Sequence, residues 1–213
     1  MRGKIFATYT GWIILINFVA FIGFLILINI YGEAPVVDML ALKPSNVLAL
    51  KNLWTFITSM FMHAGLGHLF VNMLSLLFIG SFVERLIGKK RFLIFYFASG
   101  ISAGLFFVLI SFLTGSNLDV YAVGASGAIF GLGGLLMVLT PRLPVLVFFI
   151  IPMPMWIAMI ALMGILWIMS LGLGLPIGNT AHLGGLIVGI GYGFYLRRKY
   201  PRKTRMISRF FSR

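Results

Sequence analysis

A serine, two histidines and an asparagine stand inside otherwise apolar segments of this 213-residue chain. Ser126 lies in the stretch VGASGAIFG, His182 lies in AHLGGLIVG, and His68 and Asn72 lie four residues apart in GLGHLFVNM. A serine hydroxyl becomes a strong nucleophile when a histidine within hydrogen-bond reach takes its proton. The sequence therefore predicts acyl-transfer chemistry, with Ser126 as the nucleophile and His182 as the general base.

Such chemistry also needs hydrogen-bond donors for a tetrahedral oxyanion. Ser126 is predicted to open a helix, so its backbone N–H lacks an intrahelical partner and lies at the positive end of the helix dipole. His68 and Asn72 share one helical face, and both side chains can donate to the same oxygen. We therefore expect the oxyanion hole to consist of His68, Asn72 and the Ser126 backbone N–H.

The elements that must position these residues are membrane helices. Of all residues 61% are hydrophobic and 10% are charged, whereas about a quarter of a typical soluble domain is charged. A helix needs about 20 apolar residues to span a bilayer, and six segments reach or approach that length: 10–31, 68–86, 92–114, 126–140, 155–173 and 180–196. We predict an all-α membrane protein with a six-helix bundle over residues 1–196. Prolines interrupt residues 141–155, which we expect to form an interfacial or partly re-entrant connection.

The distribution of basic residues predicts the direction of these spans. Of the seventeen Lys and Arg residues, all but Lys43 and Lys51 fall at the chain ends or in connections on the same side as those ends. By the positive-inside rule both termini are cytoplasmic, which predicts a multi-pass protein of the cell membrane with its active site open to the outer face. Residues 197–213 form a basic cytoplasmic tail, for which membrane lipid is a better partner than nucleic acid. The first apolar segment is too long for a cleaved signal peptide and is predicted to be a retained span.

With this topology the four polar side chains reach a similar depth. The three spans that carry them end at Arg85, Arg142 and Arg197 on the cytoplasmic side. At the rise of a helix the side chains lie about 20 to 26 Å above these arginines, inside a hydrocarbon core about 30 Å thick. Polar groups at that depth are costly unless they face one another or a wet cavity. The alternative to a catalytic role is simple hydrogen bonding between helices.

Glycine spacing favours close contact between the serine and histidine helices. Gly127 and Gly131 are four residues apart, and so are Gly185 and Gly189. Small residues at this spacing let helix backbones approach closely in membranes. His182 precedes Gly185 by three residues and therefore lies on the same face, so such contact would carry the imidazole toward the serine.

A catalytic dyad is predicted rather than a triad. The acidic residues are few: Glu33, Asp38, Glu84 and Asp119. Asp119 lies on the outer side but is interpreted as a loop residue, so packing must orient the imidazole. Phe130, one turn after Ser126, offers a ring for stacking, and Gly124 on the other side of the serine is a further supporting residue.

Neither a metal nor another cofactor is predicted. The chain has no cysteine, which excludes thiolate metal sites. His63 and His68 are five residues apart, which is poor facing on a helix, and no acidic ligand accompanies them. We therefore disfavour a metal site made of His63, His68 and His182, and expect a structural hydrogen bond for His63.

Together these motifs resemble the rhomboid intramembrane serine proteases. The resemblance rests on FMHAGLGHLFVNM (61–73), VGASGAIFG (123–131) and AHLGGLIVG (181–189), in that order and with six spans. It implies the same nucleophile, base and oxyanion residues, and hydrolysis of peptide bonds in or near the transmembrane helices of protein substrates. It also implies that the long first loop, residues 32–67, is associated with the membrane. Phe130 stands where many relatives have Tyr, and Trp54-Thr55 stands where many have Trp-Arg.

Two other functions compete with this interpretation. A catalytically inactive rhomboid-like protein would bind client transmembrane helices, but such proteins typically lose the serine or the histidine, and this chain keeps both. A transporter or channel would call for an acidic group within a span and an inverted repeat. The chain has no obvious repeat, and Glu84 lies only near the edge of a span. The sequence makes no prediction of oligomeric state.

Overall fold

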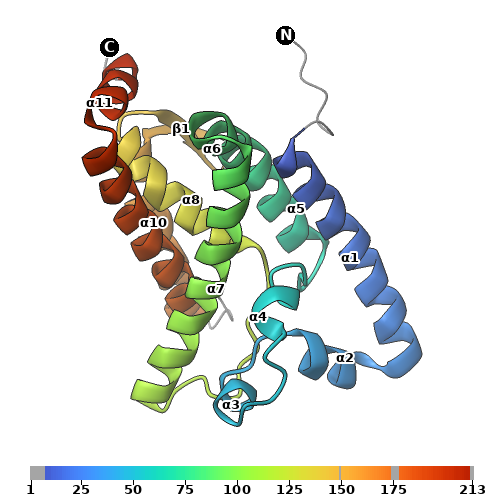
Figure 1. Ribbon diagram of the computed structural model, residues 1–213. Helices are drawn as coiled ribbons and strands as arrows, with labels where there is room; N and C mark the ends of the chain where they lie inside the picture. The colour runs from blue at the N-terminus through green and yellow to red at the C-terminus, as the bar shows by residue number, and fades with distance from the viewer. Residues whose placement is uncertain (1–7, 149, 174–177, 212–213) are drawn as a thin grey trace.

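The computed structural model describes residues 8–148, 150–173 and 178–211. Its helices form one bundle with α6, α11 and β1 at one end and α2 and α3 at the other (Figure 1). Four helical segments are long and apolar enough to cross a membrane: α1(Tyr9–Tyr31), Leu66–Ile87, α7(Lys89–Thr114) and α9(Met155–Leu173). The second consists of α5(Leu66–Ser75), the π-helical turn η2(Leu76–Gly80) and α6(Ser81–Ile87). Their bounds agree within three residues with four of the predicted spans, and the chain is a multi-pass membrane protein.

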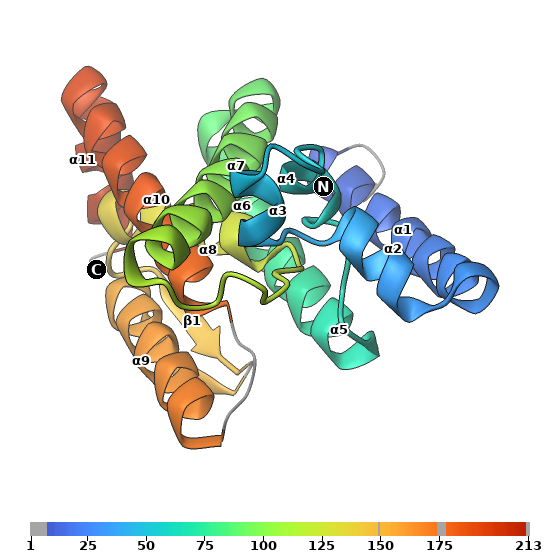
Figure 2. The same cartoon turned by 90° about the horizontal axis from the view of Figure 1, so that it is seen from below.

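Two further helices occupy the fourth and sixth apolar segments. They are α8(Ser126–Leu139), with 14 residues, and α10(Asn179–Lys199), with 21. At the rise of a helix α8 is only about 21 Å long, shorter than a hydrocarbon core of about 30 Å. Protein surrounds it, because 12 of its 14 residues are buried. α8 is therefore the central helix, in contact with α7, α9 and α10 (Figure 2).

The first connection folds as three short helices, α2(Glu33–Leu40), α3(Pro44–Leu48) and α4(Thr55–Thr58). α3 and α4 both contact α7. Leu42 and Ala122 exchange two backbone hydrogen bonds, at 3.1 and 2.8 Å. This bridge ties the first connection to the segment that leads into α8.

The expectation of an all-α chain is wrong between α8 and α9. There, β1(Pro144–Val147) pairs antiparallel with β2(Ile151–Pro154), with Pro144 opposite Pro154. Proline lacks the N–H that a helix needs and is tolerated in edge strands, whereas Val and Ile suit a pleated strand. The connection is therefore a short hairpin.

The basic tail contains a helix of its own. α11(Pro201–Phe210) follows α10 after a break at Tyr200. Proline suits the first turn of a helix because its missing N–H would have no intrahelical partner there. The Thr204 hydroxyl donates to the Tyr200 carbonyl at 3.0 Å, and Thr204 is buried. The tail thus folds against the bundle.

Candidate active site

The backbone before α8 sets the position of Ser126. Gly124 has a φ of 115°, a conformation that glycine adopts readily. Its N–H donates to the Ser59 carbonyl of the first connection at 2.8 Å. Ser126 is then the first residue of α8, so its N–H belongs to the donors that a helix leaves without an intrahelical acceptor. A hydroxyl and a backbone donor thus come from one residue.

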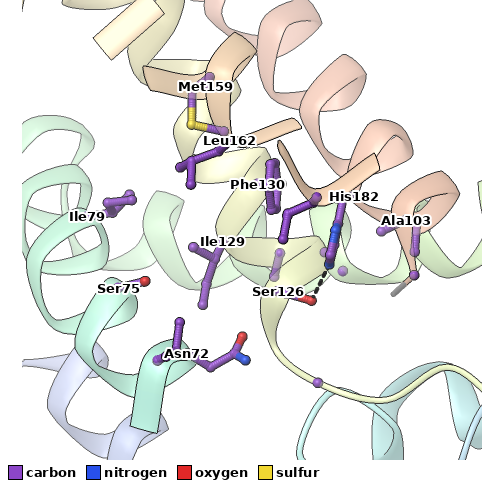
Figure 3. A pocket seen from close by; sticks show the side chains of 18 of the residues that line it. Asn72, Ser75, Ile79, Ala103, Ser126, Ile129, Phe130, Met159, Leu162 and His182 are labelled. Carbon is purple, nitrogen blue, oxygen red and sulfur yellow. Dashed lines mark hydrogen bonds between the residues drawn. The ribbon is translucent and has the colours of Figure 1, made fainter. Parts of the chain in front are cut away.

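His182 reaches this serine from α10. Its Nε2 lies 2.7 Å from Ser126 Oγ (Figure 3), within the range in which a base can take a proton. The Phe130 ring stacks on the imidazole, with centroids 4.6 Å apart and planes 14° apart. His182 is buried, so packing holds the imidazole against the hydroxyl.

Glycines bring the two helices into backbone contact. A Cβ atom at Gly185 would overlap the carbonyl oxygen of Gly127, and one at Gly189 would overlap that of Gly131. We call these four glycines the seam. His182 lies one turn before Gly185, so the seam sets the separation of the helices where the imidazole meets the hydroxyl.

His68 lies beside the turn before the serine. A Cβ atom at Gly124 would lie 3.0 Å from His68 Nε2 and 3.7 Å from Ser126 Oγ, so both groups flank the same glycine. The Ala64 N–H approaches His68 Nδ1 at 3.5 Å. A neutral ring that accepts through Nδ1 carries its proton on Nε2, which can donate into the site.

Asn72 is buried on the same face of α5, one turn after His68. Its Nδ2 donates to the His68 carbonyl at 2.8 Å, and its Oδ1 has no hydrogen-bond partner among the described residues. An amide nitrogen has two N–H groups, so this bond leaves a second donor. Figure 3 shows Asn72 and Ser126 at the same cavity.

These side chains line one cavity of about 860 Å³. Ser126, His68 and His182 lie at one end, and the cavity continues to Phe82 and Arg85 in α6. Its lining comes from the first connection, from α5 through α6, from α7, α8 and α10, and from α9 and β1, and most of it is apolar. Its volume is that of a ligand site, and its mostly apolar lining suits an apolar chain segment.

His63 supports His68 rather than standing alone. The two rings meet edge-on with centroids 5.1 Å apart, and His63 Nδ1 lies 3.3 Å from the Phe61 carbonyl oxygen. Burial, with a smaller effect from neighbouring His68, lowers the pKa of His63 to about 4, so its imidazole is neutral near pH 7. Within the described ranges, no three His, Cys, Asp or Glu side chains gather as a metal-ligand set.

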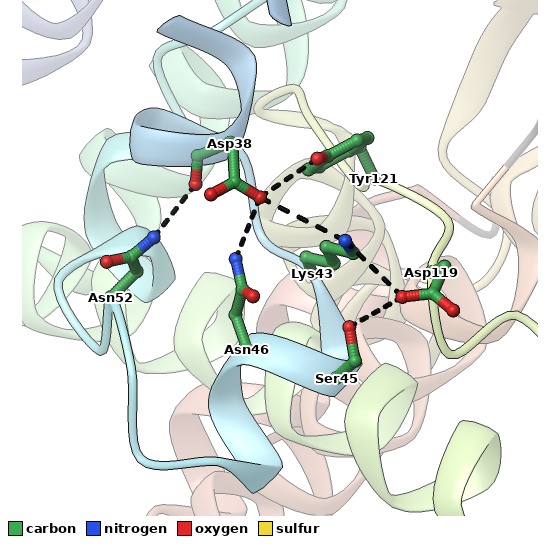
Figure 4. A network of polar contacts seen from close by, with 7 residues as sticks. All are labelled: Asp38, Lys43, Ser45, Asn46, Asn52, Asp119 and Tyr121. Carbon is green, nitrogen blue, oxygen red and sulfur yellow. Dashed lines mark hydrogen bonds and ion pairs between the residues drawn. The ribbon is translucent and has the colours of Figure 1, made fainter. Parts of the chain in front are cut away.

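A polar network joins the first connection to the segment before α8 (Figure 4). Lys43 Nζ lies 3.3 Å from Asp119 and 4.0 Å from Asp38. The Tyr121 hydroxyl donates to Asp38 at 2.9 Å, and the Ser45 hydroxyl donates to Asp119 at 2.8 Å. These contacts reinforce the backbone bridge at the same place.

Hydrogen bonds lower the pKa of both carboxyl groups in this network. For Asp38 the donors are Asn46 and then Tyr121; for Asp119 they are Ser45 and then Lys43. His182 Nδ1, by contrast, has no hydrogen-bond partner in the part of the chain that the structure describes. No carboxylate therefore extends the serine–histidine pair there.

Two polar contacts escaped the sequence patterns. Glu84 accepts hydrogen bonds from the Tyr9 N–H, the Thr10 N–H and the Thr10 hydroxyl, at 3.0, 2.9 and 2.7 Å, and so caps α1 from a distant helix. Asn179 donates through Nδ2 to the Leu166 carbonyl of α9 at 3.4 Å. The only sequence signal that could have pointed to Asn179 was its position three residues before His182.

Comparison with known proteins identifies the family to which the chain is similar. Residues 50–199 match the family model described as Rhomboid domain. The chain is 32% identical over 153 residues to Rhomboid protein 1, mitochondrial, of Saccharomyces cerevisiae (strain ATCC 204508 / S288c), covering 70% of this chain and 43% of that protein. It is 34% identical over 153 residues to Rhomboid protease GluP of Bacillus subtilis (strain 168), covering 69% of this chain and 27% of that protein. Inactive RHOMBOID-like protein 8 of Arabidopsis thaliana is 38% identical over 82 residues, covering 38% of this chain and 22% of that protein.

The chain thus spans less than half the length of each of these three relatives. The matched range includes the serine–histidine pair, His68, Asn72 and the seam. A match over most of the chain is enough to assign it: the protein belongs to the rhomboid family.

Proposed function

We propose that this protein is an intramembrane serine endopeptidase that hydrolyses peptide bonds in or near the transmembrane helices of membrane-protein substrates. The observation that carries the proposal is the 2.7 Å contact between Ser126 Oγ and His182 Nε2. Both residues line a cavity large enough for a peptide segment. Membership of a family in which GluP is named as a protease supports the same conclusion.

In the acylation step His182 Nε2 takes the hydroxyl proton of Ser126 as Oγ bonds to the scissile carbonyl carbon. The carbonyl oxygen becomes an oxyanion, for which the Ser126 N–H, His68 Nε2 and the second N–H of Asn72 are the proposed donors. The imidazolium then gives its proton to the leaving amine as the C–N bond breaks. This leaves an acyl-enzyme and a free amino terminus.

In the second step water replaces the amine. His182 accepts a proton from water as the water oxygen bonds to the acyl carbon. Collapse of the second oxyanion breaks the bond to Ser126, and the imidazolium returns its proton to Oγ. The products are a free carboxyl terminus and the starting enzyme.

We further propose that six helices cross the cell membrane, α8 and α10 together with the four long segments. Residues 1–196 then form the protease domain and residues 197–213 the cytoplasmic tail. Both termini face the cytoplasm, because the basic residues gather on that side. The serine end of the cavity faces outward, where water can reach a scissile bond below the membrane surface.

Substrate helices protect their peptide bonds by intrahelical hydrogen bonding. We therefore expect preferred substrates to contain Gly, Pro or polar residues that let the helix unwind near the outer face. Cleavage of a poly-leucine helix as fast as that of a Gly- and Pro-containing one would contradict this preference.

The test compares variants of the purified protein, reconstituted with a single-span reporter. Ser126→Ala and His182→Ala are expected to abolish cleavage, whereas Ser111→Ala, which removes a buried hydroxyl from α7, is expected to retain it. His68→Ala and Asn72→Ala should each lower the rate, by about 10²–10³-fold for a sole oxyanion donor and by less if donors overlap. Equal cleavage by wild type and Ser126→Ala would remove the proposed nucleophile.

A fluorophosphonate probe separates the enzyme from a client-binding protein that does not cleave. Labelling of wild type that is lost in Ser126→Ala and His182→Ala supports an activated serine. A folded wild-type protein that binds the reporter but takes no label would favour client binding instead.

A further inference from the structure

α11 presents two chemically different faces. Met206, Ile207 and Phe210 fall on one face, and Arg205 and Arg209 lie one turn apart beside it. Met206 is 68% exposed and Phe210 is 74% exposed. A helix with an apolar face and a basic face is suited to the membrane interface, where the apolar face meets acyl chains.

The apolar face of α11 bounds a cleft of about 550 Å³ against α6. Phe82 and Leu86 form the apolar wall on the α6 side, and Arg85 stands between them in sequence and also lines the cleft. Phe82 meets Phe211 edge-on, with ring centroids 5.6 Å apart, which docks the end of α11 on α6. Arg85 Nε donates to the Ser81 carbonyl at 3.1 Å; a guanidinium has five N–H donors, so others remain for an anion.

The carboxylate side chains that the structure describes do not neutralise this basic end. Of the chain's four acidic residues, Glu33 and Asp38 lie in α2, at the opposite end of the bundle (Figure 1), and Asp119 pairs with Lys43 of the first connection. Glu84 lies next to Arg85 but is 4% exposed, and its carboxylate accepts three hydrogen bonds at the start of α1. Among the described residues, no carboxylate side chain is therefore placed to neutralise Arg85 or the arginines of α11, so an external anion can serve as their counter-charge.

From these observations we infer that the cleft between α6 and α11 binds an anionic phospholipid. Its acyl methylenes lie against the aromatic and aliphatic walls, and its phosphate lies at Arg85. A free phosphate would satisfy the arginine but would leave the apolar walls uncovered, whereas a phospholipid matches both. Phe82 and Arg85 also line the 860 Å³ cavity, so the lipid would sit where that cavity reaches the basic side.

The test is native mass spectrometry of the purified full chain, titrated with dioleoyl phosphatidylglycerol or with dioleoyl phosphatidylcholine, which has the same acyl chains. We expect one phosphatidylglycerol to bind more tightly than phosphatidylcholine. Arg85→Gln should weaken phosphatidylglycerol binding about fivefold, because one basic residue near an anionic lipid contributes about 1 kcal/mol, and should leave phosphatidylcholine binding unchanged. Phe210→Ser should weaken both lipids.

Lys90→Gln is the matched control, since Lys90 is a basic residue at the same end of the bundle that does not line the cleft. Circular dichroism checks that each variant retains its helices. Equal binding of the two lipids, or an equal loss in Lys90→Gln and Arg85→Gln, would overturn the inference. Equally tight binding of soluble glycerol phosphate would identify a free-anion site and would overturn it too. The measurement involves no cleavage, so its outcome is independent of the proposed protease activity.

Discussion

α8 meets its neighbours on two sides in opposite ways. Toward α10 the contact is backbone to backbone, because Gly185 and Gly189 bring α10 against the carbonyls of α8. Toward α9 the contact is made by long side chains: Met159 covers Gly133, and the 860 Å³ cavity opens beyond it toward α5. Packed backbones cannot shift without a clash, whereas methionine adapts to its surroundings. The first side therefore holds the serine and histidine in register, and the second leaves room for the proposed substrate.

Among tests of this contrast between the two sides of α8, the largest effect is expected from breaking the seam. In Gly185→Ala the new Cβ would overlap the Gly127 carbonyl, which is backbone and cannot rotate away. Overpacking of this kind costs about 1–3 kcal/mol, and a shift of about 1 Å between reacting groups costs about 10²-fold in rate. Reporter cleavage and thermal unfolding in detergent measure both.

The control for this change is Gly191→Ala on the same helix. A Cβ atom at Gly191 would have no neighbour within 4 Å, and alanine is favoured over glycine in a helix by about 1 kcal/mol. Gly191→Ala should therefore keep activity and raise the unfolding temperature. If the two variants were equally active, the seam would not be what holds the catalytic pair together.

The next largest effect tests how far packing around the imidazole orients His182. Phe130→Ala removes the ring that stacks on His182, an interaction worth about 0.5–1.5 kcal/mol. We expect up to about a tenfold loss of kcat, whereas Phe130→Tyr keeps the stack and should stay near wild type. A kcat for Phe130→Ala equal to that of Phe130→Tyr would mean that other contacts orient the base.

A change on the open side should act on binding instead. Leu162 lines the cavity from α9, so Leu162→Ala enlarges it without touching Ser126 or His182. We expect the KM for the reporter to change several-fold while kcat stays within about twofold. Leu171→Ala, at an 80% exposed position of the same helix, should change neither. A fall of kcat in Leu162→Ala as large as in Gly185→Ala would erase the contrast between the two sides.

The smallest effect concerns the polar network between the first connection and the segment before α8. The pKa of Asp38 is lowered by hydrogen bonds from Asn46 and Tyr121. Its contribution to stability is therefore present above the ordinary carboxyl pKa and disappears as the pH falls through the lowered value. At pH 7 Asp38→Asn should destabilise by less than about 1 kcal/mol, because the group is near the surface. The difference from wild type should begin to shrink near pH 4 and vanish only below the lowered pKa of Asp38, as thermal unfolding measured over this pH range would show.

Local patterns were sufficient for most of the helices. The apolar segments 10–31 and 155–173 match α1 and α9 within one residue, since length and hydrophobicity decide which segments span a bilayer. The hairpin β1–β2 was missed because prolines signal only the end of a helix. Strand pairing depends instead on which residues of the partner strand lie opposite, and that is a property of the fold. α11 was missed because its many basic residues indicated only a charged tail, although its apolar residues repeat with helical spacing.

The sequence by itself determined the kinds of side chain at the site and the glycine spacings that permit close helices. These depend on residue types and on distances along one helix, which the chain order states directly. Only the tertiary structure decided that Ser126 and His182, 56 residues apart, lie 2.7 Å from each other, and that Glu84 caps α1. Such contacts depend on the rotation and offset of one helix against another, which all the packed side chains set together.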